Sequence, residues 1–283
     1  MDGFFIMQIE KNELVVEAFL TNEDSIDIRN PIHSTDFANQ YNFDGPLIAG
    51  VHVWGWATPL ILNILGQEWL EQGWAEFSFK QPTYPDDILK ITLAVKNDDQ
   101  RFDLAMVNQK NITCVVGEVG LGNAAWIDDF LSPDLINDYH GMPDNLEITK
   151  DNLIANPNWA GISQDTNSTM ARNFSLDTQR SSDDLFIGDS PKLHPAWIAG
   201  WAEDLMRHNF QVHHSIHTQS RIQFLKSIDA GTTINGNAHL IDVFEKRGHQ
   251  YVNFDVLLQD NFGDRVAMLR HWTIFKIAEP TNN

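Results

Sequence analysis

The sequence predicts an α+β protein built from two tandem copies of one unit, in which an antiparallel sheet wraps around a long apolar helix. Three observations lead to this fold class. A set of residues repeats at one spacing, each copy contains an apolar helical segment, and strand-like segments bounded by turn residues follow each helix. The 283 residues, of which 42% are hydrophobic, can build a large core, although length alone does not distinguish one domain from two.

The repeat has an offset of 145 residues. Gly55-Trp56-Ala57 recurs as Gly200-Trp201-Ala202, and Phe79 recurs as Phe224 at the same offset. Because two separate matches share one register, we interpret the chain as a duplication.

The helix of the first copy is expected to begin near Gly50, and that of the second copy near Pro195. The segment 45–66 carries no charged residue and is long enough to suggest a membrane span. His52, Pro59 and Asn63 interrupt it, and the residues that follow are amphipathic. We therefore expect a helix buried within a soluble protein.

Strands are expected to follow each helix, at 74–80, 88–96, 102–109 and 113–121 in the first copy and at 217–224, 233–244, 251–259 and 265–277 in the second. A helix followed by such a meander is typical of the hot-dog arrangement, so the sequence predicts a double hot-dog fold. We expect an N-terminal unit at 1–137 that carries the active site, a linker at 138–166 rich in Asn, Asp, Pro and Gly, and a C-terminal unit at 167–283 that shapes the pocket of this site.

Composition excludes some classes of function. The net charge of −20 argues against nucleic-acid binding, because phosphate contacts need clustered Lys and Arg. The single cysteine, Cys114, excludes an intrachain disulfide and fits a reducing compartment. Residues 1–7 lack the basic start and apolar stretch of a signal peptide. These features together predict a cytoplasmic protein.

Two segments carry a family resemblance. They are Asn30-Pro31-Ile32-His33 and the run Phe43-Asp44-Gly45-Pro46-Leu47-Ile48-Ala49-Gly50-Val51. Both resemble the (R)-specific enoyl-CoA hydratase, or MaoC-like dehydratase, family of fatty-acid metabolism. The resemblance implies an acyl-CoA or acyl-carrier-protein thioester as partner, no cofactor and no membrane association. A homodimer is compatible with it, and the sequence leaves the oligomeric state open.

The resemblance also implies roles for individual residues. His33 would be the general acid or base with Asn30 orienting it, and Gly50 would present its amide to the thioester oxygen, with Val51 and His52 beside it. The chemistry agrees, because hydration of a conjugated thioester needs a group that activates water and donors for the enolate oxygen. The start of a helix supplies such donors, and a glycine there permits close approach.

The second copy lacks these features. Pro195 stands at the position of Gly50 and has no amide hydrogen to donate, and Thr178 stands at the position of His33. We therefore expect a single active centre, on the first copy.

One position departs from the family pattern. The family has a catalytic Asp five residues before the histidine, where this chain has Ile28. Asp27 after a one-residue shift, or Asp36, could replace it, or the protein is not a hydratase. The spacing of Asp189 and His194 imitates the family's pair, but His194 aligns with Ala49 at the start of the helix, so we expect it to line the pocket.

Three functions stay open at this point: a hydratase, a thioesterase that uses the same helix start, and a non-catalytic acyl-binding protein. The cluster His213, His214 and His217 suggests a metal site by its spacing. It runs directly into a strand pattern and has no second cluster nearby, so we expect no metal site.

Overall fold

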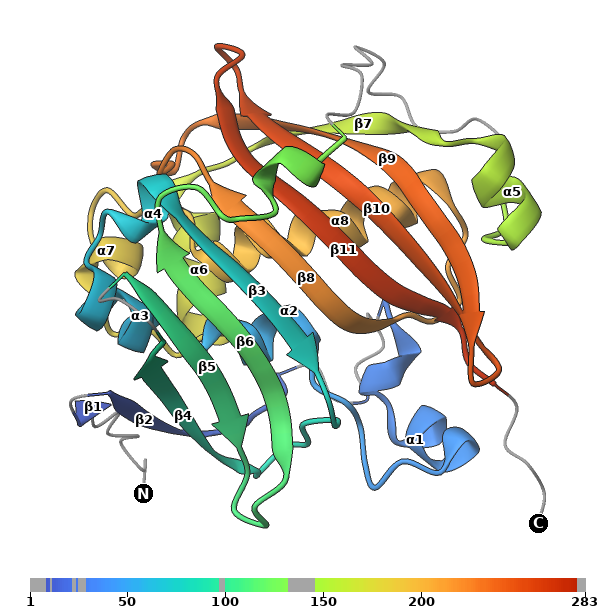
Figure 1. The fold of residues 1–283 in the computed structure, drawn as a ribbon, viewed down its shortest axis with the longest axis horizontal. Helices are drawn as coiled ribbons and strands as arrows, with labels where there is room; N and C mark the ends of the chain where they lie inside the picture. The colour runs from blue at the N-terminus through green and yellow to red at the C-terminus, as the bar shows by residue number, and fades with distance from the viewer. Residues whose placement is uncertain are drawn as a thin grey trace.

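The computed structural model describes residues 9–10, 12–21, 24, 29–96, 100–131 and 146–278. In this part of the chain the strands form one eleven-stranded sheet in the order β1-β2-β4-β5-β6-β3-β8-β11-β10-β9-β7, and neighbouring strands are antiparallel (Figure 1). The strands are β1 Ile9–Glu10, β2 Glu13–Glu17, β3 Gly73–Phe79, β4 Ile88–Val95, β5 Arg101–Val107, β6 Thr113–Leu121, β7 Asn158–Asp165, β8 Ile216–Phe224, β9 Thr233–Lys246, β10 His249–Asp260 and β11 Arg265–Lys276.

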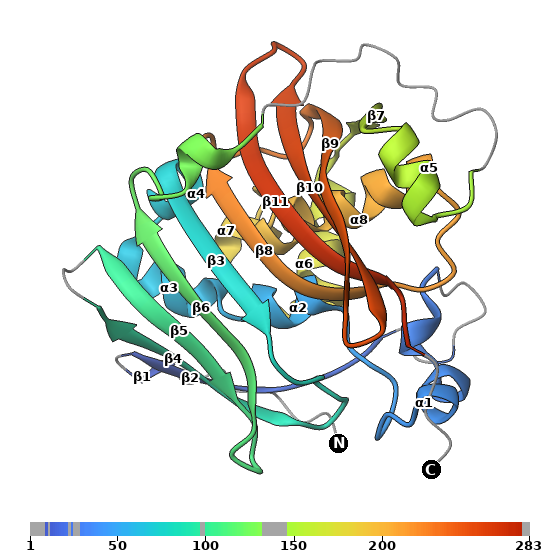
Figure 2. The same cartoon turned by 45° about the vertical axis from the view of Figure 1, so that its right-hand side comes forward.

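The sheet curves around the central helices α2, α3 and α8, with α6 and α7 on the same side (Figure 2). The α-helices are α1 Thr35–Tyr41, α2 Gly50–Gly55, α3 Thr58–Leu65, α4 Trp69–Gln72, α5 Lys150–Ala155, α6 Ser168–Asp177, α7 Asp184–Ile187 and α8 Pro195–Asn209. Two 3-10 turns, η1 Pro31–His33 and η2 Ile127–Asp129, complete the set for the described residues.

The two copies meet at the middle of the sheet, where β3 pairs with β8. Glu76 faces Arg221 across this pair, and their side chains form an ion pair at 3.2 Å. Outward from this seam the first copy runs β3-β6-β5-β4-β2 and the second runs β8-β11-β10-β9-β7. The corresponding strands therefore occupy corresponding places, and the predicted duplicated α+β fold is confirmed.

The predicted strands are confirmed as well. Each of the eight strands expected after the two helices begins and ends within two residues of the range that the sequence indicated. The agreement follows from the turn residues and the alternation of buried and exposed positions, as in β5, whose side chains alternate from Arg101 to Met106.

One prediction was wrong: the first copy does not contain a single long helix. α2 ends at Gly55, Trp56 and Ala57 form a turn with right-handed helical backbone angles, and α3 begins at Thr58. Pro59 explains the break, because it has no amide hydrogen for the carbonyl of Gly55 four residues earlier. Asp204 is the repeat equivalent of Pro59, and α8 runs through it without interruption.

The core runs through both copies. Trp54 of α2 is fully buried and stacks on Phe77 of β3, with ring centroids 4.6 Å apart. In the second copy Trp201 is equally buried. Aromatic side chains of this size contribute much of the buried apolar area that stabilises a fold. Cys114 is buried in the same cluster, as expected for a structural residue.

The predicted linker at 138–166 contains α5 and β7 in its described part. β7 pairs with β9 at the edge of the sheet, so its residues belong structurally to the second copy. The division of the chain into units at 137 and 167 stays a prediction. Of the described helices, none combines the length and the apolar character needed to cross a membrane.

Gly55 and Gly200 occupy the same place in the two copies and should respond oppositely to alanine. A Cβ at residue 55 would lie 2.6 Å from Cβ of Ala196 and 2.5 Å from Oε1 of Gln179, so α2 could no longer cross α8 this closely. A Cβ at residue 200 would meet no atom within 4 Å. We expect Gly55→Ala to lower the free energy of unfolding by about 1–3 kcal/mol, and Gly200→Ala to raise it by about 0.5–1 kcal/mol through helix propensity.

Urea unfolding of the two variants and the parent protein measures both effects. Equal destabilisation of the two variants would contradict the close crossing of α2 and α8 at residue 55.

Candidate functional site

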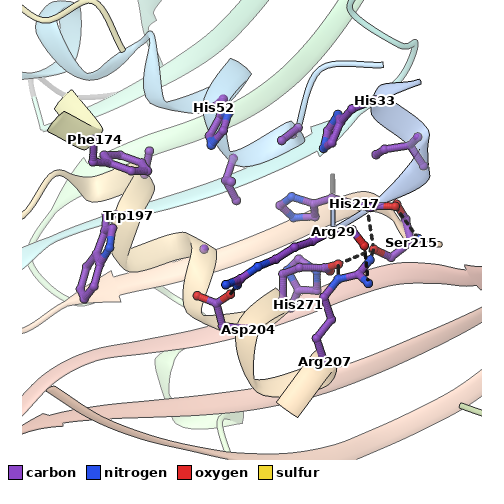
Figure 3. Close-up of a pocket in the computed structure, with 18 residues that line it drawn as sticks. Arg29, His33, His52, Phe174, Trp197, Asp204, Arg207, Ser215, His217 and His271 are labelled. Carbon is purple, nitrogen blue, oxygen red and sulfur yellow. Dashed lines mark hydrogen bonds and ion pairs between the residues drawn. The ribbon is translucent and has the colours of Figure 1, made fainter. Parts of the chain in front are cut away.

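A cavity of about 430 Å³ lies between the two copies (Figure 3). The first copy contributes the segment around η1 and the start of α2, and the second copy contributes α6, α8, β8 and β11. Its lining consists of Arg29, Asn30, Ile32, His33, Ala49, Gly50, Val51, His52, Phe174, Ala196, Trp197, Gly200, Glu203, Asp204, Arg207, Ser215, His217 and His271.

His33 lies at the end of η1 and is only 7% exposed. Its Nδ1 lies 2.6 Å from the backbone carbonyl of Leu47. Because a carbonyl can only accept, we assign the proton to Nδ1, which leaves a lone pair on Nε2. Burial lowers the pKa of His33, while the bond to Leu47 and the charge of Glu203 oppose this shift. The ring is therefore a neutral base at neutral pH.

Asn30 makes its hydrogen bonds to the second copy. Its Nδ2 donates to the carbonyl of Ser215 at 2.9 Å and to Oγ of the same residue at 3.0 Å. Its Oδ1 accepts from the amide of Ser215 at 3.3 Å. None of these bonds reaches the imidazole that Asn30 was expected to orient. Asn30 instead fixes the segment that carries His33 against the chain entering β8.

The start of α2 has free donors. Ala49 offers no side-chain cap, and its carbonyl accepts from the amides of His52 and Val53 at 2.9 and 3.1 Å. In the described part of the chain the amides of Gly50 and Val51 donate to no acceptor, as is usual in a first helical turn. Both residues line the cavity. Their amides are thus available to an oxygen of a ligand.

Glycine is required at residue 50 by close packing. A Cβ there would lie 2.8 Å from Cζ of Phe79 and 3.0 Å from Nδ1 of His217. The helix start therefore sits directly against β3 and β8, and a side chain would push it away.

His52 and His194 have different surroundings. His52 lines the cavity, and burial lowers its pKa to about 4. His194 is the N-cap of α8: its Nδ1 accepts from the amide of Ala196 at 3.1 Å. Its side chain is 2% exposed and lies outside the cavity lining, because it packs beneath Phe186 and Phe174. The structure thus gives His194 a capping position rather than the pocket position that we expected.

Of the candidates for the missing acid, the structure describes Asp36. Asp27 and Ile28 lie outside the described residues. Asp36 is exposed in the first turn of α1 and does not line the cavity.

Two carboxylates that the sequence did not indicate, Glu203 and Asp204, reach the cavity from α8. Glu203 accepts from Nε of Arg207 at 2.7 Å and from the hydroxyl of Ser215. A pair of opposite charges four residues apart, on a helix whose first eight residues carry no charge, was the available signal for this polar group.

The three clustered histidines diverge. His213 is exposed beside Glu147, His214 accepts from the amide of Ile277, and only His217 faces the cavity. Within the described ranges no group of three or more His, Cys, Asp or Glu residues is arranged to bind a metal ion. His217 and His271, which sequence reasoning did not place at the site, add two imidazoles to it.

Comparisons with known proteins identify the fold. No protein-family model and no curated protein matches the sequence. Among solved structures, a MaoC-like dehydratase superposes with a TM-score of 0.57 and 8% identity, over 94% of this chain and 98% of that chain. A conserved hypothetical protein of Mycobacterium tuberculosis with a double hotdog fold gives 0.52 and 10%, over 90% and 88%.

A third structure, from Thermobifida fusca and provisionally assigned as a thioesterase II, gives a TM-score of 0.50 and 12% identity, over 95% of each chain. Identities this low establish shared architecture and leave the reaction open. The chain has the double hot-dog fold, in common with MaoC-like dehydratases and thioesterase-like proteins.

Proposed function

We propose that this protein is an acyl-thioester hydratase or dehydratase, which adds water to a 2-enoyl thioester or removes it from a 3-hydroxyacyl thioester. One observation carries the proposal. The neutral imidazole of His33 lines the same cavity as the amides of Gly50 and Val51, and neither its Nε2 nor these two amides have a hydrogen-bond partner among the described residues. The fold shared with a MaoC-like dehydratase supports it.

The reaction would run as follows. The thioester carbonyl accepts hydrogen bonds from the amides at the start of α2, which favour the negative charge that develops on this oxygen. Nε2 of His33 takes a proton from water while the water oxygen bonds to the β carbon. The electron pair of the double bond moves to the enolate, and protonation of the α carbon by a second group completes the addition.

The substrate would be an acyl-CoA or an acyl-carrier-protein thioester. Phe174 and Trp197 supply apolar wall for the acyl chain. The side chain of Arg29 is 86% exposed on the cavity lining, 3.9 Å from Asp204, and offers a cation to the phosphates of the carrier. In a chain with a net charge of −20, one such cation would restrict where an anionic carrier can bind.

A thioesterase is the second candidate, and Glu203 favours it. A carboxylate in the cavity could activate water for attack on the thioester carbonyl, with the same amides binding the oxygen. In this reaction the carbon–sulfur bond breaks and a free thiol is released.

Purified protein with crotonyl-CoA distinguishes the candidates. Loss of the conjugated absorbance without release of free thiol indicates hydration, and release of free thiol indicates hydrolysis. Ligand-induced thermal stabilisation without either product would indicate a non-catalytic acyl-binding protein. The aliphatic residue at position 28 is compatible with this outcome, because it cannot transfer a proton.

The first prediction for the site concerns the imidazole. We expect His33→Ala to lower kcat for hydration by about 100-fold or more, the usual contribution of a general base. Asp36→Asn is the matched control and should keep the parent activity, because this carboxylate is exposed and outside the cavity. Full activity in the His33 variant, or loss of activity in the Asp36 variant, would contradict the proposed assignment.

The pH dependence provides a separate prediction. Only neutral His33 can accept a proton, and burial holds its pKa below the ordinary value of 6.5. We therefore expect the acid limb of kcat/KM for hydration to be centred below pH 6.5. A profile measured between pH 4 and pH 8 checks this, and an acid limb centred above 6.5 would argue against His33 as the base.

A further inference from the structure

Two imidazoles of the cavity, His217 of β8 and His271 of β11, have no role in the mechanism above. Their ring centroids lie 4.1 Å apart, and Figure 3 shows both rings on the part of the wall that the second copy forms. Phe77, Phe79 and Phe254 pack around them. The pair is therefore held in an apolar setting at the edge of the cavity.

A bulge in β8 places His217 in this position. Gln219 is opposite Trp272 and His217 is opposite Thr273, so Thr218 has no partner on β11. The hydroxyl of Thr218 donates to the carbonyl of Trp272 at 3.0 Å and stabilises the irregularity. An extra residue reverses the alternation of side chains, so His217 comes to the same side as Ser220.

Ser220 joins the two rings. Its Oγ lies 2.7 Å from Nε2 of His217 and 3.1 Å from Nδ1 of His271, its neighbour across the strands. Nε2 of His217 also lies 3.2 Å from the carbonyl of Gln219. Because a carbonyl only accepts, Nε2 carries the proton, and the hydroxyl of Ser220 is then free to donate to His271. These bonds leave a lone pair on Nδ1 of His217 and a proton on Nε2 of His271.

Both of these remaining atoms are buried and lack a hydrogen-bond partner among the described residues. Buried polar atoms without a partner are rare and ask for an explanation, of which a ligand is one. Burial also lowers the pKa of His217 to about 3 and that of His271 well below its ordinary value. The two rings are therefore neutral, as a chain that passes protons between tautomers requires.

We propose that His217, Ser220 and His271 form a proton relay that protonates the α carbon of the substrate. Nε2 of His271 gives its proton to this carbon, the hydroxyl proton of Ser220 moves to Nδ1 of His271, and the proton on Nε2 of His217 moves to Ser220. Nδ1 of His217 receives the proton that His33 took from water. One water is added, and the protein keeps its charge. His217 and His271 are then catalytic residues, and Ser220 is a positioning residue.

The relay supplies the proton donor that the aliphatic side chain of residue 28 cannot supply. An aliphatic side chain transfers no proton, and the described carboxylates make no hydrogen bond to His33. The relay has instead a proton acceptor at one end and a proton donor at the other, and the two residues that carry them, His217 and His271, line the cavity that holds His33 and Gly50. This inference rests on the proposed hydration of an enoyl thioester.

The test is hydration of crotonyl-CoA in mixtures of H₂O and D₂O. A relay moves several protons in one step, so we expect kcat of the parent protein to fall along a curve as the deuterium fraction rises. Ser220→Ala should lower kcat by about tenfold or more, leave KM within about twofold, and change the curve to a straight line. Ser175→Ala is the matched control, because this serine is as buried and its hydroxyl donates only to Ala171 of the same helix.

The outcomes separate the two proposals. If the parent protein does not hydrate crotonyl-CoA, the proposed function fails and the relay with it. If the parent hydrates it but shows a straight line, or if Ser220→Ala keeps both the parent rate and the curve, the relay alone is overturned. The measurement on the parent protein needs no variant. It therefore tests the relay even if Ser220→Ala fails to fold.

Discussion

The pairing of β3 with β8 is the contact on which the rest of the molecule depends. It joins two half-sheets into one and places the helix start of the first copy against a strand of the second. Nδ1 of His217 and the ring of Phe79 approach residue 50 so closely that only glycine fits. The cavity arises at this junction, since neither copy alone supplies all of its walls. Asn30 and Ser215, which are 185 residues apart, close the same junction from its other side.

The two copies differ at the start of their central helices, and this difference makes the site asymmetric. In the second copy Pro195 has no amide hydrogen, and the ring of His194 accepts from the amide of Ala196. The first turn of α8 therefore leaves neither position with an amide that needs an external acceptor. In the first copy Ala49 cannot cap, and the amides of Gly50 and Val51 have no acceptor in the part of the chain that the structure describes. Among the described residues, the two helix starts therefore differ in whether their first amides have acceptors within the protein.

The sequence predicted the architecture because its signals are local. Turn residues and alternation located the strands, the repeat related the copies, and Pro59 could have indicated the broken helix. The composition of the site was predicted only in part. His33, Gly50 and Val51 come from the two motif segments, His52 follows the second of them directly, and all four line the cavity.

The remaining site residues depend on packing between segments far apart in the chain. His271 reaches the cavity only because β11 pairs with β8, and His217 only because Thr218 is bulged out of the register. A pattern of alternating residues carries no mark of a bulge, so strand periodicity alone would give His217 the wrong face. The hydrogen-bond partner of Asn30, Ser215, could not be predicted either, because a contact between residues 185 positions apart leaves no local signal in the sequence.

The histidines of the cavity connect the chemistry to the stability of the fold. Burial lowers the pKa of His33, His52, His217 and His271, so each is neutral near pH 7 and none repels another. A buried neutral imidazole can exchange protons without first losing one to solvent. The unfolded chain, in contrast, binds protons at these residues below their ordinary pKa of about 6.5. Acidification therefore favours the unfolded state. The free energy of unfolding decreases as the pH falls from 6.5 towards the lowered pKa values of these residues. The burial that keeps these imidazoles neutral near pH 7 thus also makes the fold sensitive to acid.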